Sequence, residues 1–244
     1  MDPKKLIISF SIVSAVFMSG CKKDNQDSNP IVIPLQITIQ AAVPLATTST
    51  FAILAGSAVT NTGATTITGD LGLSPGSSIG GFPPGILTGT LHINDISATQ
   101  AKLDLTAAFN NAAGRISTDI VTLSGNIGGL TLTPGLYKST SSLAISSGDL
   151  TFDAKGNADA IFIIQIASSL TTTSGRKVFL SGGAQASNIF WEVGSSATFG
   201  TTSAMKGTIL VMQSITFNTG ATLDGKALTR TGGITMAGNV IVKQ

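Results

Sequence analysis

Short stretches of alternating apolar and polar residues run along the chain from about residue 50 to its C-terminus. In Ile215-Thr216-Phe217 the outer two residues are apolar and the middle one is polar. On a strand, the outer two would point into a core and the threonine would point outward. The same arrangement stands eighteen residues earlier, at 197–199, and again at 234–236. The outward ladder that this pattern predicts consists of Thr198, Thr216 and Thr235.

The spacing of these repeats predicts a β-solenoid. A period near 18 residues suits one coil of a solenoid, in which each coil stacks about 4.8 Å from the last. A corner rich in Gly, Thr and Asn follows each strand and would turn the chain onto the next face. Ordinary strands of a β-sandwich are the alternative, and the even spacing and glycine punctuation favour the solenoid.

One segment, residues 94–115, departs from the β pattern. Its small apolar residues recur at helical spacing, which predicts one helix over about residues 96–113 that packs closely along the solenoid. Asp95 or Ser97 can cap the start of this helix, and Gly114 suits a left-handed residue past its end. The apolar face consists of Ala98, Ala101, Leu105, Ala108 and Ala112.

The stretch before this helix, residues 71–91, is rich in Gly and Pro. We expect an irregular loop there that caps one end of the solenoid, because an open end would recruit other β edges.

The N-terminal region reads as an export signal followed by a linker. Residues 1–20 combine a basic start with an apolar run that is too short for a membrane span of about 20 residues. Met18-Ser19-Gly20-Cys21 resembles a bacterial lipobox, in which the cysteine is lipidated; an ordinary signal peptide with a chance cysteine is the alternative. We expect residues 21–44 to be a flexible tether and residues 45–244 to form one domain. The protein would then be an outer-membrane or cell-surface lipoprotein, or be released outside the cell.

Composition narrows the possible functions. Charged residues make up 11% of the chain, against roughly 25% in an average soluble protein, and the net charge is +2. Nucleic-acid binding is therefore not expected, because it needs a clustered basic surface. A single cysteine leaves no disulfide within the chain. With one histidine, His92, and scattered carboxylates, we expect no catalysis, no metal site and no cofactor.

Several longer stretches carry a resemblance to a known family. They keep their order and spacing over nearly all of residues 45–244, and they are 51–63, 69–76, 132–137, 161–166 and 180–191. Together they resemble the β-solenoid ice-binding (antifreeze) proteins of cold-adapted bacteria, fungi and diatoms. The resemblance implies a mostly β fold: a right-handed, discontinuous β-solenoid of triangular cross-section with one long helix packed alongside.

The same resemblance implies a binding surface. Some members of the family carry a Thr-Ala/Gly-x-Thr/Asn motif on one flat face, and residues 62–65 and 219–222 match it within a string, NTGAT, that the chain uses twice. That repetition makes sense if the first coil lies beside a late coil. The coils around Thr201 and Asn239 match the motif in part. The ice-binding residues that the resemblance implies are Asn61, Thr62, Gly63, Thr65, Thr201, Thr202, Asn218, Thr219, Gly220, Thr222 and Asn239.

Threonine suits an ice surface for physical reasons. Its stiff β-branched side chain presents a methyl group and a hydroxyl group together. We therefore expect a monomer that binds ice, gives thermal hysteresis and inhibits ice recrystallisation, with the membrane as a second partner through Cys21. A cell-surface adhesin or glycan-binding lipoprotein is the alternative, and it would need exposed aromatic residues. The sole Trp and Tyr, Trp191 and Tyr137, lie in apolar runs, where we expect them to pack in the core or at its edge. A purely structural envelope lipoprotein, in which the threonine ladder is only a well-formed β surface, is a further alternative.

Overall fold

A computed structural model describes residues 33–244 of the chain. The predicted signal peptide, Cys21 and the tether up to residue 32 lie outside the described residues. Within 33–244 the chain forms many short strands and one α-helix. No helix in this part of the chain is both long and apolar enough to cross a bilayer.

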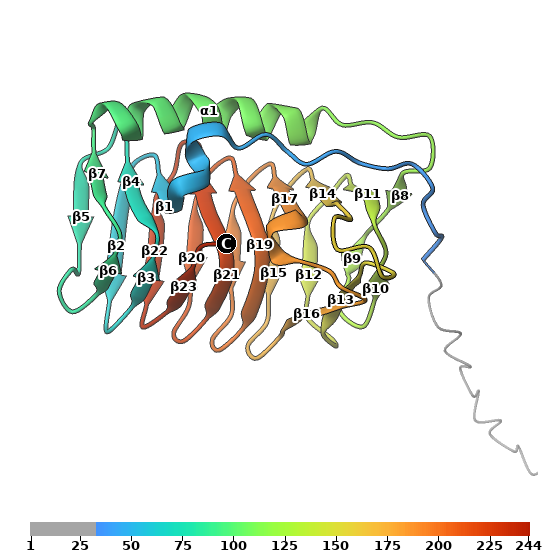
Figure 1. Cartoon of the computed structure of the whole chain (residues 1–244). Helices are drawn as coiled ribbons and strands as arrows, with labels where there is room; N and C mark the ends of the chain where they lie inside the picture. Colours follow the sequence, from blue (N-terminus) through green and yellow to red (C-terminus); the bar gives the residue numbers. More distant parts are fainter. Residues whose placement is uncertain (1–32) are drawn as a thin grey trace, which may run out of the picture. The chain divides into compact units, whose positions relative to one another are not determined.

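The strands form three faces, which we name A, B and C. One turn of the chain crosses the faces in the order B, C, A, as β2 (Ala58–Thr62), β3 (Thr66–Thr68) and β4 (Asp70–Leu73) show. Each strand pairs in parallel with strands of the neighbouring coils. This stack of three-stranded coils is the β-solenoid that the sequence predicted (Figure 1).

Face B is a continuous sheet of eight strands. Their order is β5-β2-β22-β20-β18-β15-β12-β9. Besides β2, they are β5 (Ser78–Gly80), β9 (Gly125–Asn126), β12 (Leu143–Ile145), β15 (Leu170–Thr172), β18 (Ala197–Phe199), β20 (Ile215–Phe217) and β22 (Ile234–Ala237).

Faces A and C are joined by two long strands, β19 (Ala204–Val211) and β21 (Thr222–Thr229), whose first halves lie on face C and whose second halves lie on face A. Face A also holds β1 (Phe51–Ala55), β4, β7 (Leu91–Ile93), β8 (Val121–Thr122), β11 (Gly135–Ser139), β14 (Phe162–Ile166) and β17 (Ile189–Val193). Face C also holds β3, β6 (Ile86–Thr88), β10 (Thr131–Leu132), β13 (Leu150–Asp153), β16 (Val178–Ser181) and β23 (Val240–Val242). Two short 3-10 helices, Ala46–Thr50 and Ala186–Asn188, complete the elements.

The coils do not stack in chain order. The first coils occupy one end, α1 (Ile96–Ala113) carries the chain along the stack, and the remaining coils return from β8 (Figure 1). The last coil closes on the first: β21, β22 and β23 pair with β1, β2 and β3. The expected discontinuous path, with the first coil beside a late coil, is therefore confirmed.

The helix packs on face A through the apolar residues that the sequence predicted. Ala98, Ala101, Leu105, Ala108 and Ala112 are all fully buried. All of these except Ala98 belong to one cluster with the outward side chains of face A, which include Leu54, Leu136, Ile163, Phe190, Leu210 and Leu228. Small alanines let the helix lie close to the sheet, so one face of the solenoid is covered along much of its length.

The ends of α1 agree with the prediction at one end only. The Asp95 carboxylate caps the N-terminus by accepting a hydrogen bond from the Ala98 N–H at 2.8 Å. Gly114 was expected to adopt a left-handed conformation. It does not, since its φ is −84°. The side chain of Gln165 on β14 instead caps this end, because its amide donates to the carbonyls of Ala112, Ala113 and Arg115.

Residues 71–91 are more regular than the Gly and Pro content suggested. They form β5 and β6 and most of one further coil, whose strands lie at the end of each face. The prediction of an irregular loop is therefore wrong, although the segment does occupy an end of the stack. Stacking on β2, β3 and β4 gives its backbone groups partners that the local sequence could not show.

The packed domain also begins earlier than expected. Residues 33–44, assigned to a flexible tether, lie against the solenoid. Gln36 accepts a hydrogen bond from the Leu136 N–H at 2.8 Å, and Val43 is 3% exposed. Arg115 donates to the carbonyls of Ala41 and Ala42. The boundary at residue 45 is therefore wrong, because these contacts join residues about 70 to 100 positions apart.

Replacing Gln165 by Leu should destabilise the protein by about 1–3 kcal/mol, because two carbonyls at the end of the helix and the Arg115 carbonyl just past it would lose their side-chain donor. Urea unfolding measures the loss. Gln100→Leu, on the exposed side of the same helix, is the matched control and should change stability by less than about 0.5 kcal/mol. Equal effects of the two variants would contradict a capping role for Gln165.

A buried carboxyl on face A makes stability depend on pH. Glu192 on β17 is 7% exposed and lies in register between Gln165 and Leu210. Burial raises the pKa of its carboxyl to about 7, against an ordinary value of 4.5, and Lys138 offsets this only in part. Because the folded-state pKa is the higher one, the stabilising contribution is fully present below about pH 4.5 and is lost as the pH rises through 7.

The variant Glu192→Gln should therefore remove most of this pH dependence. At pH 8 it should be more stable than the unmodified protein by on the order of 2–3 kcal/mol, because the amide carries no charge to bury. Urea unfolding between pH 5 and pH 8 provides the measurement. If the two proteins lose stability in parallel over this range, another group is responsible.

Candidate functional site

A single row of threonines runs along the outside of face B. Strand registers align Thr60 with Thr235, Thr235 with Thr216, Thr216 with Thr198, and Thr198 with Thr171. The residues on either side of each threonine in its strand point inward; Val59 and Ile215, for example, are fully buried. The predicted ladder of three threonines is therefore confirmed and is longer than predicted. Gly80 follows the row at one end, and Ala144 and Asn126 follow it at the other.

A second row follows the corner between faces B and C. Backbone hydrogen bonds join the coils there, from Thr202 to Thr219, from Gly220 to Ala237 and from Gly238 to Thr62. These bonds line up exposed or half-exposed small side chains along the edge of face B. In coil order they are Thr62, Ala237, Thr219, Thr201 and Ser174.

The first row stands on one pleated sheet, and the second row lies beside it, at the last residues of β2 and β22 and just past the ends of β20, β18 and β15. Neighbouring strands lie about 4.8 Å apart, so the threonines of the first row repeat at about that spacing. No outward position of the eight strands of face B carries a charged side chain. The array is therefore flat, stiff and neutral, with threonine as its main residue.

The other two faces differ in chemistry. Face A is covered by α1 and by residues 33–45 (Figure 1). Face C carries an ion pair between Lys206 and Asp224 at 2.9 Å, and Phe179 is 49% exposed there. Within the described residues, face B is thus the broadest uncovered surface without charge.

The glycines of the repeated motif are needed by the backbone at the corner. Gly63 and Gly220 both have positive φ, +80° and +71°, a conformation that residues other than glycine rarely adopt. Thr202 stands at the matching position of its coil and adopts φ of 57° despite its branched side chain. Substitution of Gly220 would therefore strain the fold, so a variant there cannot separate binding from folding.

Three of the predicted surface residues are buried. Asn61 is 4% exposed, and Thr65 and Asn239 are fully buried. Thr65 donates to the Asn61 side chain at 2.5 Å and accepts from the Asn239 N–H at 3.0 Å. The Asn239 amide in turn donates to the carbonyls of Asn218 and Ala221, both at 2.9 Å. The prediction that these three side chains contact ice directly is therefore wrong. They brace the corner instead.

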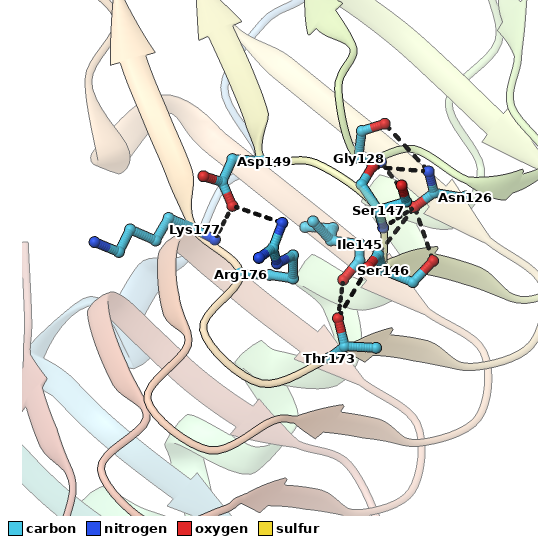
Figure 2. Close-up of polar contacts among 9 residues, drawn as sticks. All are labelled: Asn126, Gly128, Ile145, Ser146, Ser147, Asp149, Thr173, Arg176 and Lys177. Carbon is cyan, nitrogen blue, oxygen red and sulfur yellow. Dashed lines mark hydrogen bonds and ion pairs between the residues drawn. The ribbon is translucent and has the colours of Figure 1, made fainter.

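A comparable brace holds the same corner in the coils nearer β9 (Figure 2). The Asn126 side chain accepts from the backbone of Ser146 and Ser147 and donates to the carbonyls of Gly128 and Ser147. Thr173 donates to the Ser146 carbonyl at 3.1 Å, and the Asp149 carboxylate accepts from the Lys177 N–H at 2.9 Å. Polar side chains thus replace backbone partners at both parts of the corner and keep the edge of face B in place.

The remaining predicted residues divide between two faces. Thr62, Gly63, Thr201, Thr202, Asn218 and Thr219 are exposed and Gly220 is half-buried, all at the corner of face B. Thr222 begins β21 and faces outward on face C, aligned with Ala204 and Val240. Sequence reasoning placed neither Thr60 nor Thr171 in the site. The alternation within residues 58–62 and 170–172 was the signal that could have found them.

The residues that an alternative function would use point elsewhere. Trp191 and Tyr137 are both fully buried. The Trp191 indole N–H donates to the Lys206 carbonyl at 2.9 Å, and the Tyr137 hydroxyl donates to the Thr133 carbonyl at 2.7 Å. His92 pairs with Asp95 at 2.6 Å beside the helix start. Among residues 33–244, no three potential metal-ligating side chains come together.

These observations define a class of protein: a β-solenoid with one covered face, one mixed face and one uncovered, neutral face lined with threonine. A family model described as ice-binding-like matches residues 53–242. The chain belongs to this family.

Individual proteins that the chain resembles are also ice-binding proteins. The chain is 45% identical over 199 residues to an ice-binding protein of Nostoc sp. (strain HG1), covering 81% of this chain and 72% of that one. Among solved structures it is similar to an ice-binding protein from an Antarctic biological consortium, with 70% identity, a TM-score of 0.86, and coverage of 86% and 95% of the two chains. It is also similar to the ice-binding protein of the Antarctic ascomycete Antarctomyces psychrotrophicus, with 39% identity, a TM-score of 0.79, and coverage of 84% and 99%.

Replacing Thr65 by Val should destabilise the protein by about 1–3 kcal/mol, because the Asn61 carbonyl and the Asn239 N–H would both lose a buried partner. Thermal unfolding measures the effect. The neighbouring variant Thr66→Val, exposed on face C, removes the same hydroxyl group and should stay within about 0.5 kcal/mol of the unmodified protein. If Thr65→Val leaves the unfolding midpoint unchanged, the Thr65 hydroxyl does not brace the corner.

Proposed function

We propose that this protein binds ice and that face B is the surface that binds it. The in-register row of five threonines, Thr60, Thr235, Thr216, Thr198 and Thr171, carries the proposal. Membership of the ice-binding-like family supports the function. The regularity of the row supports the choice of face.

The chemistry of the row suits a partner made of ordered water. Each threonine presents a hydroxyl that can donate and accept hydrogen bonds, beside a methyl that is poorly hydrated. Because threonine is branched at Cβ, few rotamers are lost when water orders around it. Gly63 and Ala237 leave low positions between taller side chains. Water held there can occupy a fixed lattice, whereas a charged group would impose its own hydration.

Binding strength comes from repetition. A single hydrogen bond of this kind contributes only about 0.5–1.5 kcal/mol net, so one threonine would not hold an ice surface. A rigid array makes many contacts at once and loses little conformational entropy when it binds. An adsorbed protein then forces ice to grow as curved fronts between bound molecules. This growth pattern underlies thermal hysteresis and the inhibition of recrystallisation.

The other faces fit ice less well. Face A is covered by α1, and the outward column of face C contains the Lys206–Asp224 ion pair. A glycan-binding surface would need exposed aromatic rings, and both Trp191 and Tyr137 are buried. We further propose that the protein acts as a monomer and has no catalytic activity, as a passive ice adsorber would.

We also propose that the protein is exported and anchored. The basis is the sequence Met18-Ser19-Gly20-Cys21 after a short apolar run. Acylation of Cys21 would hold the domain at a cell surface, where ice binding would attach the cell to ice or shield its envelope. Mass spectrometry of the mature N-terminus distinguishes an acylated cysteine from ordinary signal cleavage.

Replacing Thr216 by Tyr should remove most of the freezing-point gap. The substitution places a bulky ring in the middle of the threonine row, so the flat array can no longer meet a flat ice surface. Growth of single ice crystals in a nanolitre osmometer measures the gap and the crystal shape. The outward-facing, half-exposed strand position can accept the ring without a change of fold.

The matched control is Thr68→Tyr, which puts the same ring on the exposed side of face C. It should leave the freezing-point gap unchanged. Thermal unfolding should give similar midpoints for both variants. Loss of the gap in Thr68→Tyr, with its retention in Thr216→Tyr, would move the ice-binding surface from face B to face C.

A further inference from the structure

One part of the described surface gathers exposed aliphatic residues. Six large apolar side chains between residues 33 and 244 are more than 60% exposed, and four of them lie in one region. Leu35, Ile37 and Ile39 are 66%, 86% and 95% exposed, and they alternate with the buried Gln36 and Gln40. Ile116, 88% exposed, lies beside Thr38, since both line one shallow recess. We call these four residues the apolar edge.

The apolar edge is held in a fixed position. Between the exposed residues, Gln36 and Gln40 are buried against the solenoid, each 8% exposed. The Asp119 carboxylate accepts hydrogen bonds from the Ile37 N–H at 2.6 Å and the Thr38 N–H at 2.8 Å. The backbone is thus tied down while the aliphatic side chains point outward. Water contact at these side chains is therefore a lasting property of the fold and not a result of fraying.

The apolar edge lies at the corner of the triangle opposite face B. Gln36 contacts Gly135, the residue at which the chain passes from face C to face A. Ile37 and Ile39 border a groove with Asn157 and Asp159, in the loop that makes the same passage one coil further on. In a coil of three faces, the corner between A and C is the one farthest from B. Anything that covers this edge leaves face B free.

We propose that the apolar edge rests on the lipid bilayer to which the chain is anchored. The inference depends on the anchoring proposed above, and the chain itself favours this occupant. Only thirteen residues, 22–34, separate Cys21 from Leu35, so an acylated cysteine would keep the edge near the membrane. Lys22 and Lys23 directly follow the anchor and suit anionic lipid headgroups. Apolar side chains and an acyl anchor bind a bilayer together better than either does alone.

The proposal gives the anchored protein a defined orientation. With the A–C corner on the bilayer, the threonine row faces away from the cell. A tether alone would let the domain turn face B toward the membrane as often as toward ice. The apolar edge removes that freedom.

A fluorescent probe at the edge tests this orientation. Cys21 is the only cysteine, and acylation occupies its thiol, so a new cysteine can be labelled selectively. The full chain is produced in a bacterium that acylates lipoproteins and placed on vesicles of phosphatidylethanolamine and phosphatidylglycerol. An NBD label at Thr118→Cys, beside Ile116, should shift its emission to the blue and be quenched by nitroxides on the lipid acyl chains. The same label at Thr216→Cys on face B should show neither effect.

A variant separates the apolar edge from the anchor. The triple change Ile37→Asn, Ile39→Asn and Ile116→Asn should abolish the blue shift at position 118 while Cys21 stays acylated. The three positions are solvent-exposed, so the domain should keep its unfolding midpoint. The same variant should keep the full freezing-point gap, because face B is untouched. If the unmodified chain shows no freezing-point gap, the proposed ice binding is contradicted, whereas the result of the fluorescence experiment on vesicles still stands.

Three outcomes would overturn the inference. Water-like emission at position 118 on vesicles, with Cys21 acylated, would mean that the edge does not touch lipid. An unacylated Cys21 in the mature chain would remove the anchor on which the inference depends. Energy transfer between labelled copies at high dilution on the vesicles would place a second copy of the chain on the edge.

Discussion

The structure depends on the parallel hydrogen-bond ladder in which the last coil closes on the first. β22 pairs with β2 in a single register, Val59 with Ile234 and Thr60 with Thr235. Because side chains alternate along a strand, a slip of one residue at this junction would turn Thr60 inward and Val59 outward. The buried column of Val59, Ile234 and Ile215 prevents such a slip, since its burial is worth about 1.5–3 kcal/mol per side chain. The same contacts that make the core therefore align the threonines on the surface.

A flat surface also needs stable edges, and the corner between faces B and C provides one. Glycines in left-handed conformations turn the chain there, and side chains such as Asn61, Thr65, Asn239 and Asn126 take over the hydrogen bonds that the turning backbone leaves open. Part of the Thr-Gly-x-Thr motif is thus structural. Its first threonine faces solvent, its glycine sets the turn and its last threonine is buried at Thr65. A motif that looks like a uniform binding surface in sequence contains both contact residues and the supports that position them.

The cover on face A and the charges on face C explain why one face remains for a broad contact. α1 and residues 33–45 shield face A. Face C is interrupted by charge at Lys206 and Asp224. The helix has a further consequence for the chain path: because it carries the chain from β7 to β8, the two copies of NTGAT come to flank the coil of Ala237 and Asn239. Strands far apart in sequence thereby share one surface, and the N-terminal segment is left to occupy the opposite corner.

Local patterns in the sequence determined much of this. The apolar–polar alternation at 215–217 gave the strand and its outward threonine, the alanine spacing gave α1 within its observed bounds, and the period gave the solenoid. These features depend on neighbours a few residues away, so a single sequence contains them. The tertiary structure alone decided three other matters. It buried Asn61, Thr65 and Asn239 because adjacent coils supply their partners, and it ordered residues 33–44 through contacts with β11 and Asp119. It also added Thr60 and Thr171 to the row, since only the register between coils from distant parts of the chain shows which threonines stand in line.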